Sequence, residues 1–405
     1  MLSSLYKTEM IFKIFFVLSW WTLLGWIFFS GEMYKNLIQV QSINDTSSKF
    51  PAGEISRVER IHVMIVMCNE PKDEDMEEDE KGSKMVLQAE TLLKTLVLFS
   101  SRPITVHLAH NDHTIVKQIK AAVSKFGKGN WIRIAAVSIE YPPGMEDMIN
   151  EYRICATAKM FFPDLLPEVD AGIYLDTDIL MLGDPALLWD RFELFSPFTA
   201  LALAPVDAVY NVQKNNPRIP YYGLPGVGLN SGVFLMNLTR LRALPGGGFT
   251  GAVRAIWDQY KGNLPFPDQD IINVVGEQSP YLIQPLPCEW NFIIWQCRRL
   301  PIEGTNLVWT KSCPAASKDG IAVLHGAGGM FSVDEVFSTV VQFWIEQDVK
   351  RWDAVEGLVD LEARVEKAMQ EEKGDCANVP DFKDMLLLRL RKMVNSTLQY
   401  YQYRH

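Results

Sequence analysis

Residues 173–182 read IYLDTDILML, an apolar run interrupted by two aspartates one residue apart. Burying two carboxylates in such a run is unfavourable unless a cation or a hydrogen-bond network neutralises them. Because residues i and i+2 of an extended strand point to the same side, Asp176 and Asp178 can reach one hard metal ion. Asp-x-Asp alone is a weak signal, and a solvated pair at a strand end or a helix cap is the alternative. The apolar residues on both sides favour the metal site.

Short apolar runs of the same kind recur before and after this motif. They are typical of strands covered on both faces and occupy residues 61–67, 104–108, 131–139, 171–175, 200–204, 233–236 and 321–324. Helix-like segments separate several of them, at residues 85–99, 151–162 and 249–260. This alternation predicts an α/β fold with a mostly parallel central sheet and helices on both faces. In such sheets ligands bind at the carboxyl ends of the strands.

Three further motifs place polar residues at the ends of apolar runs. Residues 228–237, GLNSGVFLMN, suit hydrogen bonds to a sugar, although a turn before a strand is the alternative. Residues 267–273, PDQDIIN, begin a helix, where the acids could merely cap free N–H groups. Residues 321–329, IAVLHGAGG, end a strand in His325 and a glycine-rich turn. A lone histidine is usually structural, but this one can supply a third metal ligand while the glycines let a phosphate approach.

Taken in order, these residues resemble glycosyltransferase family 8, the retaining nucleotide-sugar enzymes with the Rossmann-like GT-A fold. The matching pieces span residues 61 to 332 and are Asp176-Thr177-Asp178, Asn230-Ser231-Gly232, Asp268-Gln269-Asp270 with Asn273, Trp290-Asn291 and His325-Gly326. Within the family, residues 153–156, 162–163, 221–223 and 287–291 look most like the glucoside xylosyltransferases. Those are type II membrane enzymes that add α-linked xylose from UDP-xylose to O-linked glucose on EGF-like repeats.

The resemblance implies a role for each candidate site residue. Asp176, Asp178 and His325 would hold Mn²⁺, with Mg²⁺ as the alternative ion, against the diphosphate of UDP. The nucleotide would meet Cys68, Asn69 and Glu70 near uridine, Lys159 at a phosphate oxygen, and Thr177, Ser231, Gly326 and Gly328. Asn230 and Asp268 would bind sugar hydroxyls, and Gln269 would lie beneath the anomeric carbon. The expected catalytic residues are therefore Gln269, Asp268 and Asp178.

Retention of configuration is likewise implied by the family. The amide of Gln269 is a poor nucleophile, which favours same-face attack over a covalent intermediate. Many family members carry a lysine shortly after the histidine-glycine turn, whereas this chain has Gly329-Met330-Phe331 there. Neutralisation of the diphosphate would then fall on the metal, on Lys159, or on Arg298 and Arg299.

The N-terminal region predicts a membrane anchor. Residues 11–29 are almost entirely apolar and would span about 28 Å as a helix. We expect a cytosolic tail at 1–13, an uncleaved type II anchor at 14–30, a stem at 31–56, a catalytic domain at 57–350 in the ER or Golgi lumen, and a helical C-terminal extension at 351–405. Lys7 and Lys13 before the span agree weakly with this orientation.

Charge and cysteine content narrow the possible functional and structural classes of the protein. Thirty-nine Lys plus Arg against 49 Asp plus Glu argue against binding to a nucleic-acid backbone. Residues 71–82 are rich in acids and predict a solvated loop. Six cysteines are too few for a disulfide scaffold, although Cys288, Cys297 and Cys313 could hold one bridge, and Cys68 and Cys155 have core-like neighbours.

Three rival functions remain open from the sequence. An aspartate phosphatase also uses Asp-x-Asp after an apolar strand, but usually early in its domain. The chain could transfer glucose or galactose from a UDP-sugar, because pocket shape must discriminate these from xylose. It could also be a luminal protein that kept the fold and lost turnover, given the absent lysine.

Overall fold

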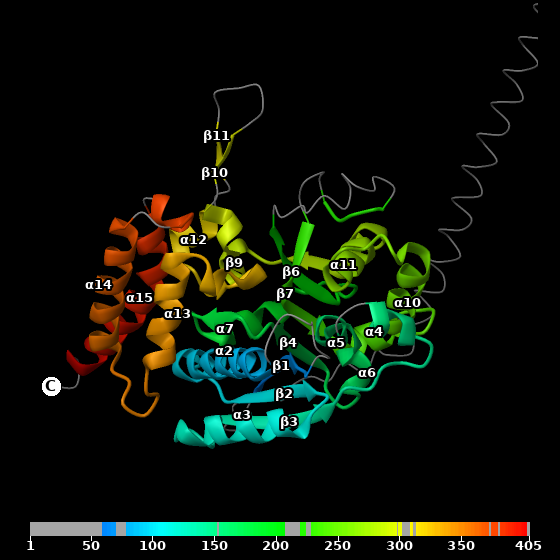
Figure 1. The fold of residues 1–405 in the computed structure, drawn as a ribbon, viewed down its shortest axis with the longest axis horizontal. Helices are drawn as coiled ribbons and strands as arrows, with labels where there is room; N and C mark the ends of the chain where they lie inside the picture. Colours follow the sequence, from blue (N-terminus) through cyan, green and yellow to red (C-terminus); the bar gives the residue numbers. More distant parts are fainter. Residues whose placement is uncertain are drawn as a thin grey trace, which may run out of the picture. The chain divides into compact units, whose positions relative to one another are not determined.

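The main sheet has seven strands in the order β3-β2-β1-β4-β7-β6-β8 (Figure 1). Their bounds are β1 (Ile61–Met67), β2 (Ile104–His110), β3 (Ile132–Ser138), β4 (Ala171–Leu175), β6 (Leu201–Val206), β7 (Gly228–Asn237) and β8 (Ile283–Pro285). β7 runs antiparallel to both of its neighbours, and the other pairings are parallel. The predicted mostly parallel sheet is therefore confirmed.

The computed structural model describes residues 59–69, 78–151, 154–206, 219–223, 228–297, 299–301, 308–310, 313–371, 374–379 and 381–402. They belong to one compact unit, Val58–His405. The predicted tail, anchor and stem, residues 1–56, lie outside this part of the chain. Within the part described, no helix is both long enough and apolar enough to cross a bilayer.

Both faces of the sheet are covered, which explains why its strands are apolar throughout. In β1, Ile61, Val63 and Ile65 join the core beneath α2 (Glu78–Phe99) and α3 (His113–Lys125). Met64 and Val66 point to the other face, which packs against α10 (Gly248–Tyr260) and α11 (Pro267–Gln278). The expectation of helices on both faces is confirmed.

A second, three-stranded sheet has the order β5-β12-β9. Its strands are β5 (Ile179–Met181), β12 (Val323–His325) and β9 (Phe292–Ile293). The predicted strand at 171–175 is confirmed as β4. The expectation that Asp176 and Asp178 lie in an extended strand is wrong, because residues 176–178 form a turn between two sheets. The turn arises because the residues after it pair with β12 rather than with the main sheet.

The predicted helix over 151–162 is also wrong in detail. The chain forms α4 (Glu146–Glu151), α5 (Ile154–Ala158), a 3₁₀ turn η1 (Lys159–Phe161) and α6 (Phe162–Leu165). Residues 159–163 are all buried, whereas an amphipathic helix buries only one face. The predicted acidic loop 71–82 is wrong at its end, because α2 already begins at Glu78; residues 70–77 lie outside the described part.

The C-terminal region is helical, as expected. Helices α13 (Glu335–Glu346), α14 (Ala354–Gln370) and α15 (Phe382–Gln402) share a third apolar core with Phe292 and Leu324 of the second sheet. The remaining elements are α7 (Pro185–Trp189), η2 (Asp190–Leu194), α9 (Leu238–Arg242), η3 (Pro280–Leu282), η4 (Cys288–Trp290), η5 (Ile294–Cys297), β10 (Arg299–Pro301), β11 (Val308–Thr310), α12 (Pro314–Asp319), η6 (Ala327–Ser332) and η7 (Cys376–Asn378).

All six cysteines are paired. The bridge expected within the cluster of three is confirmed as Cys288–Cys313. Cys297 pairs instead with Cys376, and Cys68 with Cys155. These partners are 79 and 87 residues apart, so no local sequence pattern could have indicated them.

Candidate active site

The turn Asp176-Thr177-Asp178 is held between the two sheets by backbone hydrogen bonds. The N–H of Asp176 donates to the carbonyl of Gly232 on β7 (2.8 Å), and the N–H of Gly326 donates to the carbonyl of Asp178 (2.8 Å). Because His325 pairs with Ile179 in the β5–β12 register, the histidine lies beside Asp178. The fold thus brings together residues nearly 150 positions apart.

The three expected metal ligands converge. One ligand atom from each of Asp176, Asp178 and His325 lies within 4.8 Å of the others. His325 Nε2 is 3.4 Å from Asp178 Oδ1 and 3.8 Å from Asp176 Oδ2. Burial by itself raises the pKa of Asp178, but His325, a backbone hydrogen bond and Lys159 together lower it below its ordinary value. Two carboxylates and an imidazole are a donor set that suits Mn²⁺ or a similar divalent ion, so the residues present fit a metal.

Asp176 divides its two carboxylate oxygens between two tasks. Its Oδ1 accepts from Lys159 Nζ (3.0 Å) and from the Tyr174 hydroxyl (2.5 Å). Its Oδ2 is the oxygen that faces His325. One oxygen is therefore anchored, and the other is presented to the place where a cation would lie.

Lys159 lies at the centre of these charges and is 4% exposed. Besides Asp176, its ammonium group contacts Asp268 Oδ2 (2.9 Å) and the carbonyl of Ser231 (3.3 Å). Burial lowers the pKa of Lys159, but the two carboxylates more than compensate and the pKa is raised well above its ordinary value. The expected phosphate contact stays a prediction, since carboxylates and a carbonyl already occupy this ammonium group.

The N-terminus of α11 faces the same place. Asp268 Oδ2 also accepts from the Ser231 hydroxyl (2.7 Å), and Gln269 Oε1 accepts from Asn230 Nδ2 (3.1 Å). The predicted sugar-contacting residues Asn230, Asp268 and Gln269 are therefore neighbours. Ser231 joins them through Asp268.

Other side chains of α11 fasten it to the sheet. Asn273 accepts from the N–H of Leu229 (2.7 Å) and donates to its carbonyl (2.9 Å), as a neighbouring strand would. Asp270 is fully buried and accepts from the N–H of Phe266 (2.8 Å) and from the Tyr221 hydroxyl (3.3 Å). Burial raises the pKa of Asp270 to about 7. Asp270 is thus a structural member of the motif.

Two glycines leave room for these contacts. A Cβ on Gly232 would lie 2.1 Å from the His325 ring, and one on Gly326 would lie 2.6 Å from Phe331. Any side chain at Gly232 would displace the histidine from the two aspartates. The neighbouring Gly328 lies in the 3₁₀ turn η6.

The expected uridine contacts follow β1. Cys68 is buried and bonded to Cys155. Asn69 is exposed; its N–H donates to Asn111 Oδ1 (2.8 Å) and its Nδ2 to Asp112 Oδ2 (2.6 Å). Glu70 and Arg298 lie outside the described residues, and nothing is established for the Arg299 side chain. The sequence analysis did not identify Asn111 and Asp112 as neighbours of Asn69. Their position at the carboxyl end of β2 could have indicated them.

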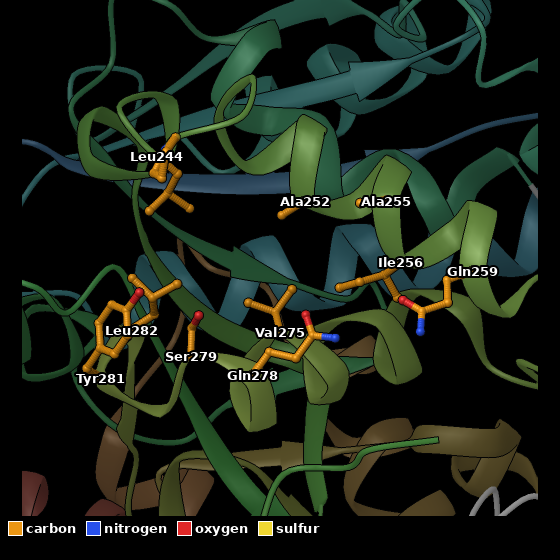
Figure 2. Close-up of a pocket in the computed structure, with 11 residues that line it drawn as sticks. Leu244, Ala252, Ala255, Ile256, Gln259, Val275, Gln278, Ser279, Tyr281 and Leu282 are labelled. Atoms are coloured by element: carbon orange, nitrogen blue, oxygen red, sulfur yellow. The ribbon is translucent and has the colours of Figure 1, made fainter. Parts of the chain in front are cut away.

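A hollow of about 180 Å³ lies elsewhere, between α10 and α11 (Figure 2). Ile256 and Gln259 line it from α10, and Val275 and Gln278 from α11. Gln278 is ten residues from Asp268, which places it roughly 15 Å farther along the helix. The hollow is therefore separate from the candidate site.

Comparisons with known proteins agree on one family. The family model described as Glycosyl transferase family 8 matches residues 89–325. Glucoside xylosyltransferase 1 of Danio rerio is 30% identical over 308 residues, which are 69% of this chain and 69% of the relative. The Homo sapiens protein of that name is 30% identical over 293 residues, 70% of this chain and 60% of its own length. Mouse xyloside xylosyltransferase 1, in its apo crystal structure, aligns with a TM-score of 0.46 at 16% identity over 67% of this chain and 99% of that one.

Proposed function

Because the chain belongs to glycosyl transferase family 8, we propose that it transfers xylose from UDP-xylose, in α linkage, to O-linked glucose on EGF-like repeats. Its mostly parallel sheet is the GT-A fold of that family. The observation that carries the proposal is the convergence of Asp176, Asp178 and His325 beside the N-terminus of α11. The choice of xylose rests on the names of the relatives at 30% identity. Family membership also removes the aspartate-phosphatase alternative.

The metal-facing residues prepare the site for the leaving group. When bound, a divalent cation supplies Lewis-acid neutralisation of the departing diphosphate. Asp176 Oδ2 and Asp178 Oδ1 lie 3.8 Å and 3.4 Å from His325 Nε2, close enough for the three groups to share a cation. Lys159 neutralises Asp176 and Asp268 in the protein itself, so the carboxylates keep their positions without the donor.

The residues on α11 bind and orient the sugar. In the proposal, Asn230 and Asp268 contact its hydroxyl groups and the Gln269 amide lies beneath the anomeric carbon. An amide held by Asn230 is a polar contact rather than a nucleophile, which favours same-face attack. The leaving phosphate oxygen then accepts the proton of the acceptor hydroxyl.

The location of the enzyme is part of the proposal. We place an anchor at residues 14–30 and the catalytic domain in the lumen of the ER or Golgi. Three disulfide bonds favour an oxidising compartment, because cytosolic thiols are kept reduced. This location would provide both partners: the UDP-sugar donor and a glucosylated EGF-like repeat as acceptor.

The test is a panel of UDP-xylose, UDP-glucose and UDP-galactose with Mn²⁺, a glucose-bearing acceptor and the full chain in detergent. We expect xylose transfer that EDTA abolishes. Glucose or galactose transfer without xylose transfer would contradict the donor assignment. If no donor is transferred or hydrolysed in a metal-dependent way, the alternative of a family-8 fold without turnover is favoured, as the absent lysine after His325 would allow.

A further inference from the structure

A chain of three side-chain hydrogen bonds joins His325 to Gln269. His325 Nδ1 is 2.8 Å from Asn291 Oδ1, Asn291 Nδ2 is 2.7 Å from Asn230 Oδ1, and Asn230 Nδ2 is 3.1 Å from Gln269 Oε1. Its ends are a residue proposed to hold the metal and one proposed to face the sugar. Asn291 lies in the middle, is fully buried, and has no role in the proposed function.

The backbone fixes the direction of this chain. The N–H of Gly232 can only donate, and it contacts Asn230 Oδ1 at 2.9 Å. The amide of Asn230 therefore presents oxygen toward Gly232 and Asn291, and its NH₂ group toward Gln269. Asn291 must therefore donate from its NH₂ group to the oxygen of Asn230, and the side-chain oxygen of Asn291 then faces His325.

This direction decides which nitrogen of His325 carries the proton. An amide oxygen only accepts hydrogen bonds, so Nδ1 of His325 must be the N–H. In the neutral ring Nε2 then has a free lone pair, and Nε2 is the atom that lies 3.4 Å from Asp178 and 3.8 Å from Asp176. Ligating histidines in proteins are commonly oriented by such a partner on the second nitrogen.

We infer that Asn291 is a positioning residue that sets the metal-ready tautomer of His325 and, through Asn230, orients the amide of Gln269. The inference rests on the proposed function and adds a link between its metal and sugar sides. Water does not replace these contacts, because His325 is 2% and Asn230 is 9% exposed.

The fold holds the backbone of Asn291 independently of its side chain. The next two residues form β9, in which Ile293 pairs with His325 of β12. The guanidinium groups of Arg191 and Arg389 lie 5.7 Å and 5.2 Å from the ring centre of the preceding Trp290. Two disulfides, at Cys288 and Cys297, enclose the segment. A substitution at Asn291 should therefore change the hydrogen bonds more than the path of the chain.

Three variants of the full chain in detergent separate the links. Asn291→Ala loses both bonds. Asn291→Asp still accepts from His325 but no longer donates to Asn230. Asn230→Asp still accepts from Gly232 and Asn291 but no longer donates to Gln269. The tautomer of His325 is read by ¹⁵N NMR of histidine-labelled, metal-free protein, with His325→Gln assigning the signal, and Mn²⁺ affinity is read by EPR titration.

We expect Asn291→Ala to mix the two tautomers and to weaken Mn²⁺ binding about 10- to 100-fold. Asn291→Asp and Asn230→Asp should keep the Nδ1–H tautomer and the Mn²⁺ affinity while lowering sugar transfer. Asp353→Ala, which removes a remote cap of α14, controls for a general loss of stability and should leave tautomer and Mn²⁺ affinity unchanged. If Asn291→Ala does not fold, the two aspartate variants still test the inference, because they should retain Mn²⁺ affinity while losing sugar transfer.

Two results would overturn the inference: an unchanged tautomer and Mn²⁺ affinity in Asn291→Ala, or equal loss of metal affinity and transfer in the aspartate variants. Failure of the wild-type chain to bind Mn²⁺ has a different meaning. It would contradict the metal in the proposed function, while the tautomer in the metal-free protein would still decide the role of Asn291.

Discussion

Two polar clusters that touch α11 are built in opposite ways. The site cluster, formed by Lys159, Asp176, Asp178, Asp268 and His325, gathers three carboxylates around a single lysine. The Asp270 cluster, formed by Asp270, Tyr221 and the N–H of Phe266, lies two residues farther along the helix. Among the described residues, its one carboxyl group is hydrogen-bonded to neutral donors.

The difference shows where the chain tolerates negative charge. In the Asp270 cluster, burial and the charge of Asp268 raise the pKa of the carboxyl to about 7, although the hydrogen bonds from Phe266 and Tyr221 oppose the rise. In the site cluster, the contacts of Asp178 with His325, a backbone hydrogen bond and the charge of Lys159 lower the pKa of Asp178 despite its burial. An excess of carboxylates over cations in one buried cluster is costly unless a further cation joins them. The excess therefore marks the site cluster as the one that serves a ligand.

The largest difference between the two clusters is expected when Asp178 is substituted. Asp178→Asn removes a charged oxygen from the metal-facing side, and we expect sugar transfer to fall by about 10²- to 10³-fold. Asp270→Asn is the matched control, because it makes the same chemical change at a carboxyl group that is hydrogen-bonded to Phe266 and Tyr221 and is not among the metal-facing residues. Measuring kcat and Mn²⁺ affinity of both variants tests this, and equal losses in the two would contradict the contrast between the clusters.

Lys159 tests the charge balance of the site cluster. Lys159→Met leaves Asp176 and Asp268 without their shared cation, and we expect the free energy of unfolding to fall by about 3 kcal/mol. The effect is at the low end for a buried pair because the side chain of Asp176 is 27% exposed. The control is Lys261→Met, whose ion pair with Asp147 is about half exposed on both sides and is screened by water, so that its loss should change the stability much less. Urea unfolding compares the two, and similar losses would mean that Lys159 is not the neutralising group.

How far the sequence could predict these clusters follows from their geometry. Six of the seven main-sheet strands were predictable because both faces of the sheet are covered and the runs are apolar throughout, whereas the three-residue β8 was not predicted. The pairing of a second sheet was not predictable, because only contact with the distant β12 directs the residues after Asp178 away from the main sheet. Asp176, Asp178 and His325 were visible as polar residues at the ends of apolar runs.

The neighbours of those three residues could not be read in the same way. Lys159 is a buried lysine whose partners are 17 and 109 positions away, so only tertiary contacts reveal that it neutralises carboxylates. Asn291 was part of a recognised motif, but its task depends on the direction of hydrogen bonds that the backbone N–H of Gly232 sets. Sequence spacing contains neither fact.

Asp270 gives the smallest expected effect and sharpens the comparison through pH. Its carboxyl pKa is about 7 in the folded chain against an ordinary value of 3.8, so between these values the folded state binds more protons than the unfolded state. The stabilisation is complete below the lower value and is lost as pH rises through about 7. Burial raises the pKa of Tyr221, so its hydroxyl stays protonated across this window, and Asp268 is the other acid whose charge acts on Asp270.

Asp270→Asn can keep both hydrogen bonds without a charge. We expect the variant to be about 1–3 kcal/mol more stable than the wild type at pH 8, and this gain to disappear near pH 4. Thermal unfolding across this range measures it, and a gain that does not change with pH would show that Asp270 is not the titrating group.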